Sequence, residues 1–370
     1  MIVFPDYKNN ILNISASLAA YLGVENSYPQ LDILQDKLNK GFSTVIFIIF
    51  DALGYYNLKY HLDENDLLVR ETHKKITSVF PSTTTNATTT MMSLSYPGEH
   101  CWLGWSLYFK EIDSCVDIFL NKISGKDHYL KEDFVFNIIP YSNFYNRRKN
   151  EAIDVYTLFP EFVATGKSKN HRSYRDLADM FTHLDDFCRV PGRKIIYTYC
   201  NEPDQTMHLH GATSNETGQI IKEINRLVSS FSERLSDTLL IISADHGQID
   251  ITEHIELYRD QALQKYLVRP LSMETRAASM LVDPMREEEF QKFFSSIYSE
   301  HSLYKTIDLI ASGVFGQPVI PQARAFLGNY IAVPQGNSGF LLHDAVKQYP
   351  GNHGGLTPEE MYVPLILIET

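Results

Sequence analysis

Short apolar runs alternate with helical patterns over the first two thirds of the chain. Residues 45–50 and 239–242 are uninterrupted apolar runs of strand length, whereas 16–22 and 220–227 repeat apolar residues at helical spacing. Fully apolar strands joined by helices are typical of a parallel sheet that is buried on both faces. The pattern therefore predicts an α/β fold with a mostly parallel central sheet and helices on both faces.

The periodicity changes in the last third of the chain and then returns. Residues 287–298 form an amphipathic helical pattern, and short strand-like runs such as 330–333 lie between glycines and prolines. The final apolar run, 363–368, resembles the strands of the first part. We expect three segments: a catalytic α/β core over 1–254, an inserted α+β cap or lid subdomain over 255–342, and a return to the core over 343–370.

Acidic residues follow three of the apolar runs. Asp51 comes directly after its run, Asp245 follows its run after Ser243 and Ala244, and Asp204 lies a few residues beyond the run 195–199. The carboxyl ends of parallel strands meet at one edge of a sheet, where α/β proteins bind ligands, so we expect these carboxylates to lie together. His246 follows Asp245 directly. Carboxylate oxygens and imidazole nitrogens suit Zn²⁺ and related divalent ions.

Two further histidines extend this pattern. His208 lies four residues after Asp204, a spacing that places both side chains on one face of a helix; His210 is the competing ligand. His353 lies among glycines, which allow the backbone to approach a metal ion or a phosphate closely. Each motif alone is more often an ordinary loop or helix feature. Together they indicate two sets of ligands and hence a two-metal site.

A hydroxyl-rich run, residues 80–90, lies between these motifs. Its plain interpretation is a turn followed by a helix N-cap, since Ser and Thr favour that position. A hydroxyl at a helix start also lies beside free N–H groups that attract phosphate. Because coordination to a metal ion deprotonates a bound hydroxyl, one of these threonines is a candidate nucleophile.

The amino-acid composition limits the kinds of molecule that the protein is expected to bind. The 370 residues carry a net charge of −12, from 45 acidic and 33 basic side chains, which disfavours a long nucleic acid. A small phosphate ester remains compatible, because a bound metal ion supplies local positive charge. Four cysteines without CxxC pairing fit a reducing compartment, and no signal-peptide pattern or membrane-spanning run is visible. We expect a cytoplasmic protein without a membrane span.

The order of the motifs resembles the alkaline phosphatase superfamily, and more narrowly the type I phosphodiesterase/nucleotide pyrophosphatase family, over residues 43–110, 194–249 and 351–368. The resemblance implies that Thr84, four residues after Phe80, is the nucleophile, with Thr83 and Thr85 as register alternatives. It also implies two divalent metal ions, zinc in that family, with ligands carried over in two sets. Asp51, Asp245, His246 and Thr84 would hold one ion, and Asp204, His208 and His353 would hold the other.

One departure concerns the substrate. Many nucleotide-cleaving members have an asparagine for the phosphate oxygen shortly after the segment that matches 96–100. Residues 101–106 contain none, and Trp105 or Ser106 stands near that place. These two residues are therefore the candidate substrate contacts, with the indole N–H as a possible donor.

The sequence thus predicts a metal-dependent hydrolase of phosphoric ester or anhydride bonds. The first hypothesis is a two-zinc phosphodiesterase or nucleotide pyrophosphatase that uses a covalent threonine intermediate on a small phosphate-ester or nucleotide substrate. The alternatives are a phosphomonoesterase, phosphonate hydrolase or phosphoryl transferase of the same superfamily, and a non-catalytic metal-binding protein. A sulfatase is disfavoured because the chain has no Cys-x-Pro-x-Arg stretch. The sequence does not indicate an oligomeric state.

Overall fold

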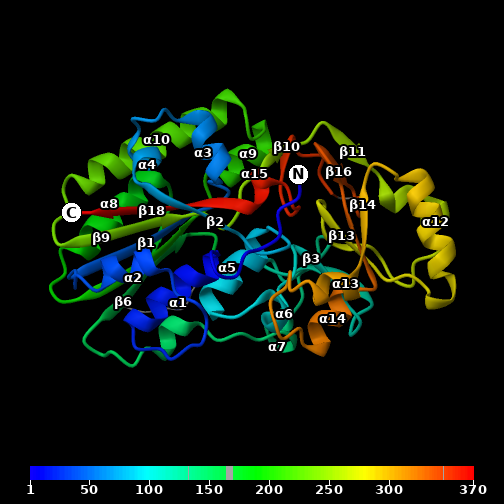
Figure 1. Cartoon of the computed structure of the whole chain (residues 1–370), viewed down its shortest axis with the longest axis horizontal. Coiled ribbons are helices and arrows are strands. Elements are labelled where there is room, and N and C mark those ends of the chain that lie inside the picture. Colours follow the sequence, from blue (N-terminus) through cyan, green and yellow to red (C-terminus); the bar gives the residue numbers. More distant parts are fainter. Residues whose placement is uncertain (132, 164–169, 345) are drawn as a thin grey trace.

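The computed structural model describes residues 1–131, 133–163, 170–344 and 346–370. Two sheets lie side by side along the long axis of the molecule (Figure 1). The central sheet has the strand order β2-β18-β9-β1-β8-β6-β7. Its strands are β1 (Thr44–Phe50), β2 (Thr72–Thr77), β6 (Asp154–Pro160), β7 (His171–Tyr174), β8 (Lys194–Cys200), β9 (Thr238–Ser243) and β18 (Tyr362–Glu369).

The central sheet is parallel except at one side. β1 pairs in parallel with β8 and β9, and β6 pairs in parallel with β7 and β8. Only β18 runs antiparallel, between β9 and β2, among the strands that the structure describes. Every residue of β1 and β9 is buried, as expected for strands covered on both faces. The predicted α/β fold with a mostly parallel sheet is confirmed.

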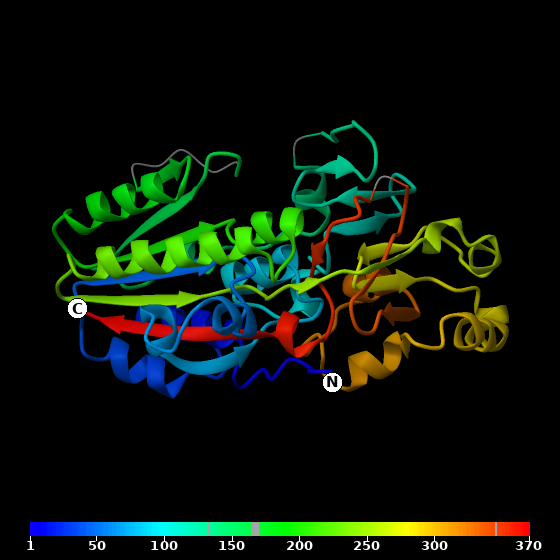
Figure 2. The ribbon, with the colours of Figure 1, turned by 90° about the horizontal axis from the view of Figure 1, so that it is seen from above.

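Helices cover both faces of this sheet. α3, α4 and α10 lie along one face, and α1 and α2 lie along the other (Figure 1); Figure 2 gives the view from above. The α-helices outside residues 255–342 are α1 (Ile11–Tyr21), α2 (Asp32–Leu38), α3 (Tyr55–His61), α4 (Leu67–Arg70), α5 (Thr84–Ser93), α6 (Pro97–His100), α7 (Phe134–Ile138), α8 (Leu177–Cys188), α9 (Asp204–His210), α10 (Asn215–Ser232) and α15 (Pro358–Met361), of which α7 packs beside the second sheet.

The second sheet is antiparallel throughout its described pairings, with the order β14-β15-β13-β12-β3-β4-β5. Its strands come from two stretches of the chain: β3 (Ser106–Phe109), β4 (Ser114–Asp117) and β5 (Lys122–Ile123), and β12 (Ser272–Glu274), β13 (Ala277–Met280), β14 (Ser302–Lys305) and β15 (Tyr330–Val333). The segment 255–342 therefore supplies one part of this sheet and residues 106–123 supply the other. The division of the chain at 255 and 342 stays a prediction.

Shorter elements surround the second sheet. The expected helix near 287–298 is present as α12 (Glu287–Ile297), whose buried face carries Phe290 and Phe294. The other elements are α11 (Gln261–Gln264), α13 (Thr306–Ala311) and α14 (Pro321–Leu327), the strand pair β11 (Glu253–Ile255) and β16 (Ser338–Phe340), and the strand pair β10 (Ile249–Asp250) and β17 (Gly351–Asn352).

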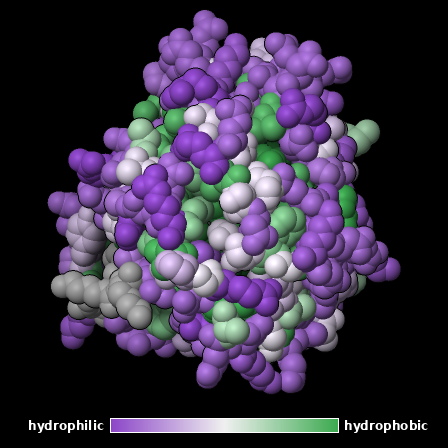
Figure 3. Space-filling view, turned by 90° about the vertical axis from the view of Figure 1, so that its left-hand side faces the viewer, coloured by the Kyte–Doolittle hydropathy of each residue, from purple (hydrophilic) through white to green (hydrophobic). Residues whose placement is uncertain are grey.

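The surface is mostly hydrophilic at the end of the molecule opposite the second sheet, where apolar residues form smaller areas between polar ones (Figure 3). Apolar side chains instead gather in one large core around the central sheet and two smaller cores beside the second sheet. Within the described part of the chain, no helix combines the length and the hydropathy that crossing a bilayer requires.

Candidate metal centre and active site

Three neighbouring strands of the central sheet end at the same level. In the order β9-β1-β8, Phe50 of β1 pairs with Cys200, and Ile49 pairs with Ser243. Asp51 therefore leaves β1 next to the turns that follow β8 and β9. The turn after β8 leads to Asp204 at the start of α9, and the turn after β9 carries Asp245. The topology of the sheet brings the three aspartates to one edge, as the apolar runs indicated.

Six of the predicted ligands form two groups in which the ligand atoms lie within 4.8 Å of one another. In the first group, which consists of Asp51, Asp245 and His246, Nε2 of His246 lies 3.4 Å from Asp51 Oδ1 and 3.5 Å from Asp245 Oδ2. The two groups adjoin, because the rings of His246 and His353 stack with their centroids 3.9 Å apart. The groups are Asp51, Asp245 and His246, and Asp204, His208 and His353.

The second group has the same arrangement. Asp204 Oδ1 lies 3.4 Å from Nε2 of His208 and 3.7 Å from Nε2 of His353. His210 is exposed at the end of α9 and belongs to neither group. Backbone carbonyls hold the three imidazoles through Nδ1, which leaves Nε2 directed at the carboxylates. These contacts are His208 to Gly351 O at 2.9 Å, His246 to Gly247 O at 3.1 Å, and His353 to Ser82 O at 3.1 Å.

Thr84 begins α5 and is the threonine whose hydroxyl reaches the first group. Its Oγ1 lies 3.2 Å from Nε2 of His246 and 3.4 Å from Oδ2 of Asp51, and the residue is 8% exposed. The Thr85 hydroxyl is buried without a hydrogen-bond partner among the described residues. The Thr83 hydroxyl instead lies near Glu274, whose pKa it lowers against the larger opposing effect of burial. The geometry therefore favours Thr84 over both register alternatives.

Burial dominates the electrostatics of these groups. It raises the pKa of Asp204 well above its usual range and that of Asp245 to about 6. Burial, followed by the charge of Asp245, raises the pKa of Asp51. Burial also lowers the pKa of His246 to about 4 and that of His353 well below its ordinary value. The two imidazoles are thus neutral at pH 7, the form that binds metal ions.

The donor set fits divalent cations. One oxygen of Asp204 and one of Asp245 are buried without a hydrogen-bond partner in the described ranges. The ion-pair partners of the three aspartates, over the same ranges, are histidines rather than lysines or arginines. Two buried carboxylates and a third that is largely buried, all without a basic partner, are electrostatically unfavourable, and bound cations would offset their charge.

Tyr199 is a site residue that the sequence analysis missed. Its hydroxyl donates a hydrogen bond to Oδ2 of Asp51. Tyr199 lies in β8 directly beside Ile49 of β1, so its side chain reaches the edge where Asp51 follows. Burial raises the pKa of this phenol, which keeps it a neutral donor. In the sequence it is one aromatic residue within an apolar strand, and nothing there separates it from a core residue.

Trp105 and Ser106 lie at the start of β3 in the second sheet. The backbone N–H of Trp105 donates to Oε1 of Glu274 at 2.5 Å, and the indole is 38% exposed beside Phe119. Ser106 is buried, and its hydroxyl bonds to that of Ser124 at 2.6 Å. The hydroxyl of Ser106 is thus already engaged within the sheet. The role of both residues as substrate contacts stays a prediction.

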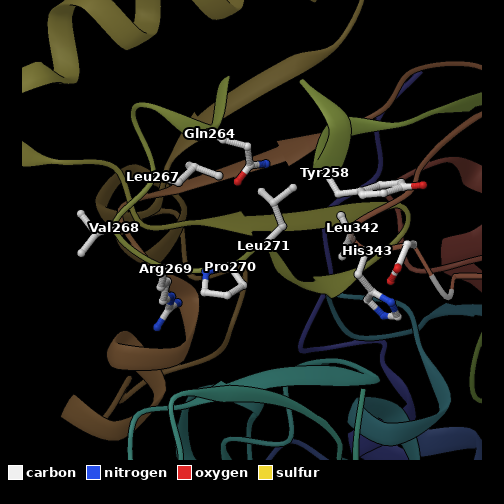
Figure 4. Close-up of a pocket in the computed structure, with 10 residues that line it drawn as sticks. Tyr258, Gln264, Leu267, Val268, Arg269, Pro270, Leu271, Leu342 and His343 are labelled. Carbon is white, nitrogen blue, oxygen red and sulfur yellow. The ribbon is translucent and has the colours of Figure 1, made fainter. Parts of the chain in front are cut away.

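A cavity of about 500 Å³ lies next to the start of β12 in the second sheet (Figure 4). Arg269, Pro270 and Leu271, just before β12, form one wall, and Leu342 and His343 form another. Its volume falls in the range of small-molecule sites. None of its lining residues belongs to the two ligand groups. The candidate active site is therefore at the ligand groups and not in this cavity.

These features define a class of protein: an α/β fold whose parallel strands carry two adjoining carboxylate–imidazole groups and a helix-starting threonine, as in the alkaline phosphatase superfamily. Comparison with known families narrows this further. The chain belongs to the type I phosphodiesterase / nucleotide pyrophosphatase family, which residues 45–300 match. The predicted superfamily and family are confirmed, and the predicted enzyme class is the one that the name of this family describes.

Solved structures share the fold at low sequence identity. Murine ectonucleotide pyrophosphatase / phosphodiesterase 5 superposes with a TM-score of 0.65 over 88% of both chains, at 14% identity. Phosphonoacetate hydrolase from Sinorhizobium meliloti 1021 gives a TM-score of 0.62 over 87% of this chain and 89% of that chain, at 13% identity. At such identities the likeness concerns the fold alone.

A curated relative shares more sequence over a shorter region. The alkaline phosphatase-like protein PglZ of Bacillus cereus (strain H3081.97) is 28% identical over 233 residues, which cover 59% of this chain. The matched region covers 23% of the length of that relative. The chain thus corresponds to less than a quarter of PglZ.

Proposed function

We propose that this protein hydrolyses a phosphodiester or phosphoanhydride bond at a two-zinc centre, with Thr84 as the nucleophile. One observation carries the proposal: the Thr84 hydroxyl lies at the start of α5, 3.2 Å from His246 and 3.4 Å from Asp51, beside two adjoining ligand groups. The names of the similar structures, a nucleotide pyrophosphatase/phosphodiesterase and a phosphonoacetate hydrolase, support a substrate cleaved at phosphorus.

The two ligand groups would each hold one divalent ion, with Thr84 joining the group of Asp51. Oxygen and nitrogen donors without a thiolate are compatible with zinc, which accepts carboxylate and imidazole ligands. When bound, two such ions supply positive charge for the attacking and leaving oxygens and favour the deprotonated form of the threonine hydroxyl. This assignment uses all seven ligands predicted from the sequence: Asp204, His208 and His353 for one ion, and Asp51, Asp245, His246 and Thr84 for the other.

The protein's own groups would position the reaction. The first turn of α5 has backbone N–H groups without helical partners, and a phosphoryl group bound to Thr84 would lie at this end of the helix, where such groups stabilise anions. Thr84 Oγ1 would form a bond to phosphorus while the bond from phosphorus to the leaving oxygen breaks. Water would then release the phosphoryl group from Thr84 and restore the hydroxyl. Tyr199 would hold Asp51 in place through its hydrogen bond to Oδ2.

The charge around Thr84 favours diesters over monoesters. Residues 80–97 contain no Lys or Arg, and the hydroxyl of Thr84 contacts only Asp51 and His246 among the described residues. Arg276 lies near enough to influence the pKa of His353, but its guanidinium is paired with Glu360. Two divalent ions offset the single charge of a diester, whereas the additional charge of a monoester finds no basic side chain among the described residues that contact the Thr84 hydroxyl.

A substrate panel tests the proposal. The zinc-supplemented protein is assayed with bis-p-nitrophenyl phosphate, p-nitrophenyl phosphate, the p-nitrophenyl ester of thymidine monophosphate, phosphonoacetate and a sulfate ester. We expect kcat/KM for the diesters to exceed that for the monoester by about 10-fold or more, the effect of one charge-assisted contact. Equal or reversed rates would favour the monoesterase, and turnover of phosphonoacetate alone would favour the phosphonate hydrolase.

A further inference from the structure

A buried ion pair joins the second sheet to the return of the chain into the core. Arg276, in the turn between β12 and β13, and Glu360, in α15, are both fully buried. Nε and Nη2 of Arg276 each lie 3.0 Å from one oxygen of Glu360, which makes the pair bidentate. The third nitrogen, Nη1, donates to the carbonyl oxygens of Gly336 at 3.0 Å and Ser338 at 2.5 Å. Such fork-to-fork pairing fixes the orientation of both side chains.

Glu360 also holds the turns that carry one imidazole from each ligand group. Its Oε1 accepts a hydrogen bond from the backbone N–H of Gly355 at 2.8 Å, two residues after His353. Its own backbone carbonyl accepts from the N–H of Gly247 at 2.8 Å, the residue directly after His246. A single residue of α15 therefore restrains both turns, and the rings of these two histidines stack on each other.

Close packing makes this restraint rigid. A Cβ atom on Gly247 would lie 2.0 Å from the carbonyl oxygen of Glu359, and one on Gly355 would lie 2.7 Å from Oε2 of Glu360. Both turns thus lie flush against α15, with no room for a side chain between them. A displacement of α15 would move both imidazoles with it.

Helix capping alone does not explain the pair. Glu360 forms a capping box with Thr357, whose hydroxyl donates to Oε2 at 2.9 Å. Capping needs only that local contact and works equally well at an exposed helix end. Burying a second, oppositely charged side chain from a distant sheet is energetically costly, and a cap does not require it.

We propose that Arg276 and Glu360 are positioning residues of the metal centre, which hold His246 and His353 at the separation that two adjoining ions require. The inference rests on the proposed two-metal function and adds to it a role for the second sheet, through Arg276. Neither residue contacts the ligand groups as a ligand. They act through the turns at Gly247 and Gly355.

The test is a zinc titration by competition with a chromophoric chelator, on the full chain, with thermal unfolding measured in parallel. Glu360→Gln and Arg276→Met are each expected to weaken zinc binding about 10- to 100-fold, the usual effect of changing a residue that orients a ligand. The double variant R276M/E360Q leaves no unpaired buried charge. We expect it to regain thermal stability relative to the single variants while its zinc affinity stays low.

Two further variants keep the test decisive. Thr357→Ala removes the capping partner but leaves the ion pair and the Gly355 contact, so it should lower stability and leave zinc affinity unchanged. Arg276→Lys keeps the positive charge but loses the bidentate contact, so we expect it to lose less zinc affinity than Arg276→Met. It replaces Arg276→Met in the test if that variant does not fold.

The outcomes separate the two proposals. Wild-type zinc affinity in Glu360→Gln and in the double variant, whatever their stability, would overturn the positioning role. A wild-type protein that binds two zinc ions but cleaves no phosphorus ester would overturn the proposed activity and leave the positioning role intact. A wild-type protein that binds no divalent ion would overturn both.

Discussion

The two sheets of this molecule use their edges differently. In the central sheet, β9, β1 and β8 run parallel, so their carboxyl ends lie together and deliver Asp245, Asp51 and the turn to Asp204 to one place. In the second sheet the described strands are antiparallel, so successive strand ends alternate between opposite edges. That sheet supplies none of the six ligands, but it supplies Arg276 and Trp105. Parallel topology collects the candidate ligands, whereas the turn between β12 and β13 reaches them only indirectly, through the contacts of Arg276 with Glu360 and of Glu360 with Gly355.

The largest expected effect tests the central-sheet edge. Thr84→Ala should reduce turnover by about 10³-fold or more, because it removes the atom that attacks phosphorus, while the fold and the metal content remain. Thr85→Ala is the matched control, since its hydroxyl has no partner among the described residues. Steady-state kinetics and metal analysis measure both variants. If Thr84→Ala kept near-normal turnover and Thr83→Ala or Thr85→Ala were inactive, the nucleophile would be that other threonine and not Thr84.

The same edge shows how much the sequence could reveal. Asp51 and Asp245 were predictable because each lies within three residues of the end of an apolar run, and parallel topology then dictates where such residues lie. The hydroxyl-rich run 80–90 predicts a helix start but does not by itself select one threonine, and Thr84 came from the family resemblance. Tyr199 was not predictable, since its contact with Asp51 depends on the register between two strands that are distant in the sequence.

The second sheet was harder to predict for a physical reason. Its strands come from 106–123 and 272–333, and pairing between distant antiparallel segments leaves no local periodic signal in either. The Met273–Ser106 pairing joins the two stretches. The Arg276–Glu360 pair likewise joins residues far apart in the chain, and each would be interpreted from the sequence as an ordinary exposed charge.

Acidification should weaken metal binding at the central-sheet edge. Burial raises the pKa values of Asp51, Asp204 and Asp245, that of Asp245 to about 6, so the metal-free protein takes up protons on these carboxylates as the pH falls. Zinc must displace these protons, and its affinity should fall by about 10-fold or more for each pH unit below 6. His246, with its pKa lowered to about 4, stays neutral over most of this range and competes little. Competition titrations at pH 8, 7, 6 and 5 measure the effect, and an affinity that does not change with pH would contradict it.

A smaller effect is expected from the second sheet. Trp105→Ala should raise KM for an aromatic diester about 3- to 10-fold and leave kcat nearly unchanged, because a stacking contact stabilises the bound substrate without taking part in bond breaking. Phe136→Ala, at another exposed aromatic residue, is a control that should leave both constants unchanged. A kcat effect as large as that of Thr84→Ala would place Trp105 in the chemical step and remove the contrast between the two sheets.

Anomalous diffraction at the zinc edge, from crystals of the zinc-loaded protein, tests the two-metal centre most directly. We predict two peaks about 4 Å apart, because two-metal sites hold their ions at that separation. One peak should lie among Asp51, Asp245 and His246, and the other among Asp204, His208 and His353. A single peak, peaks outside these groups, or ions separated by about 10 Å or more would contradict the account.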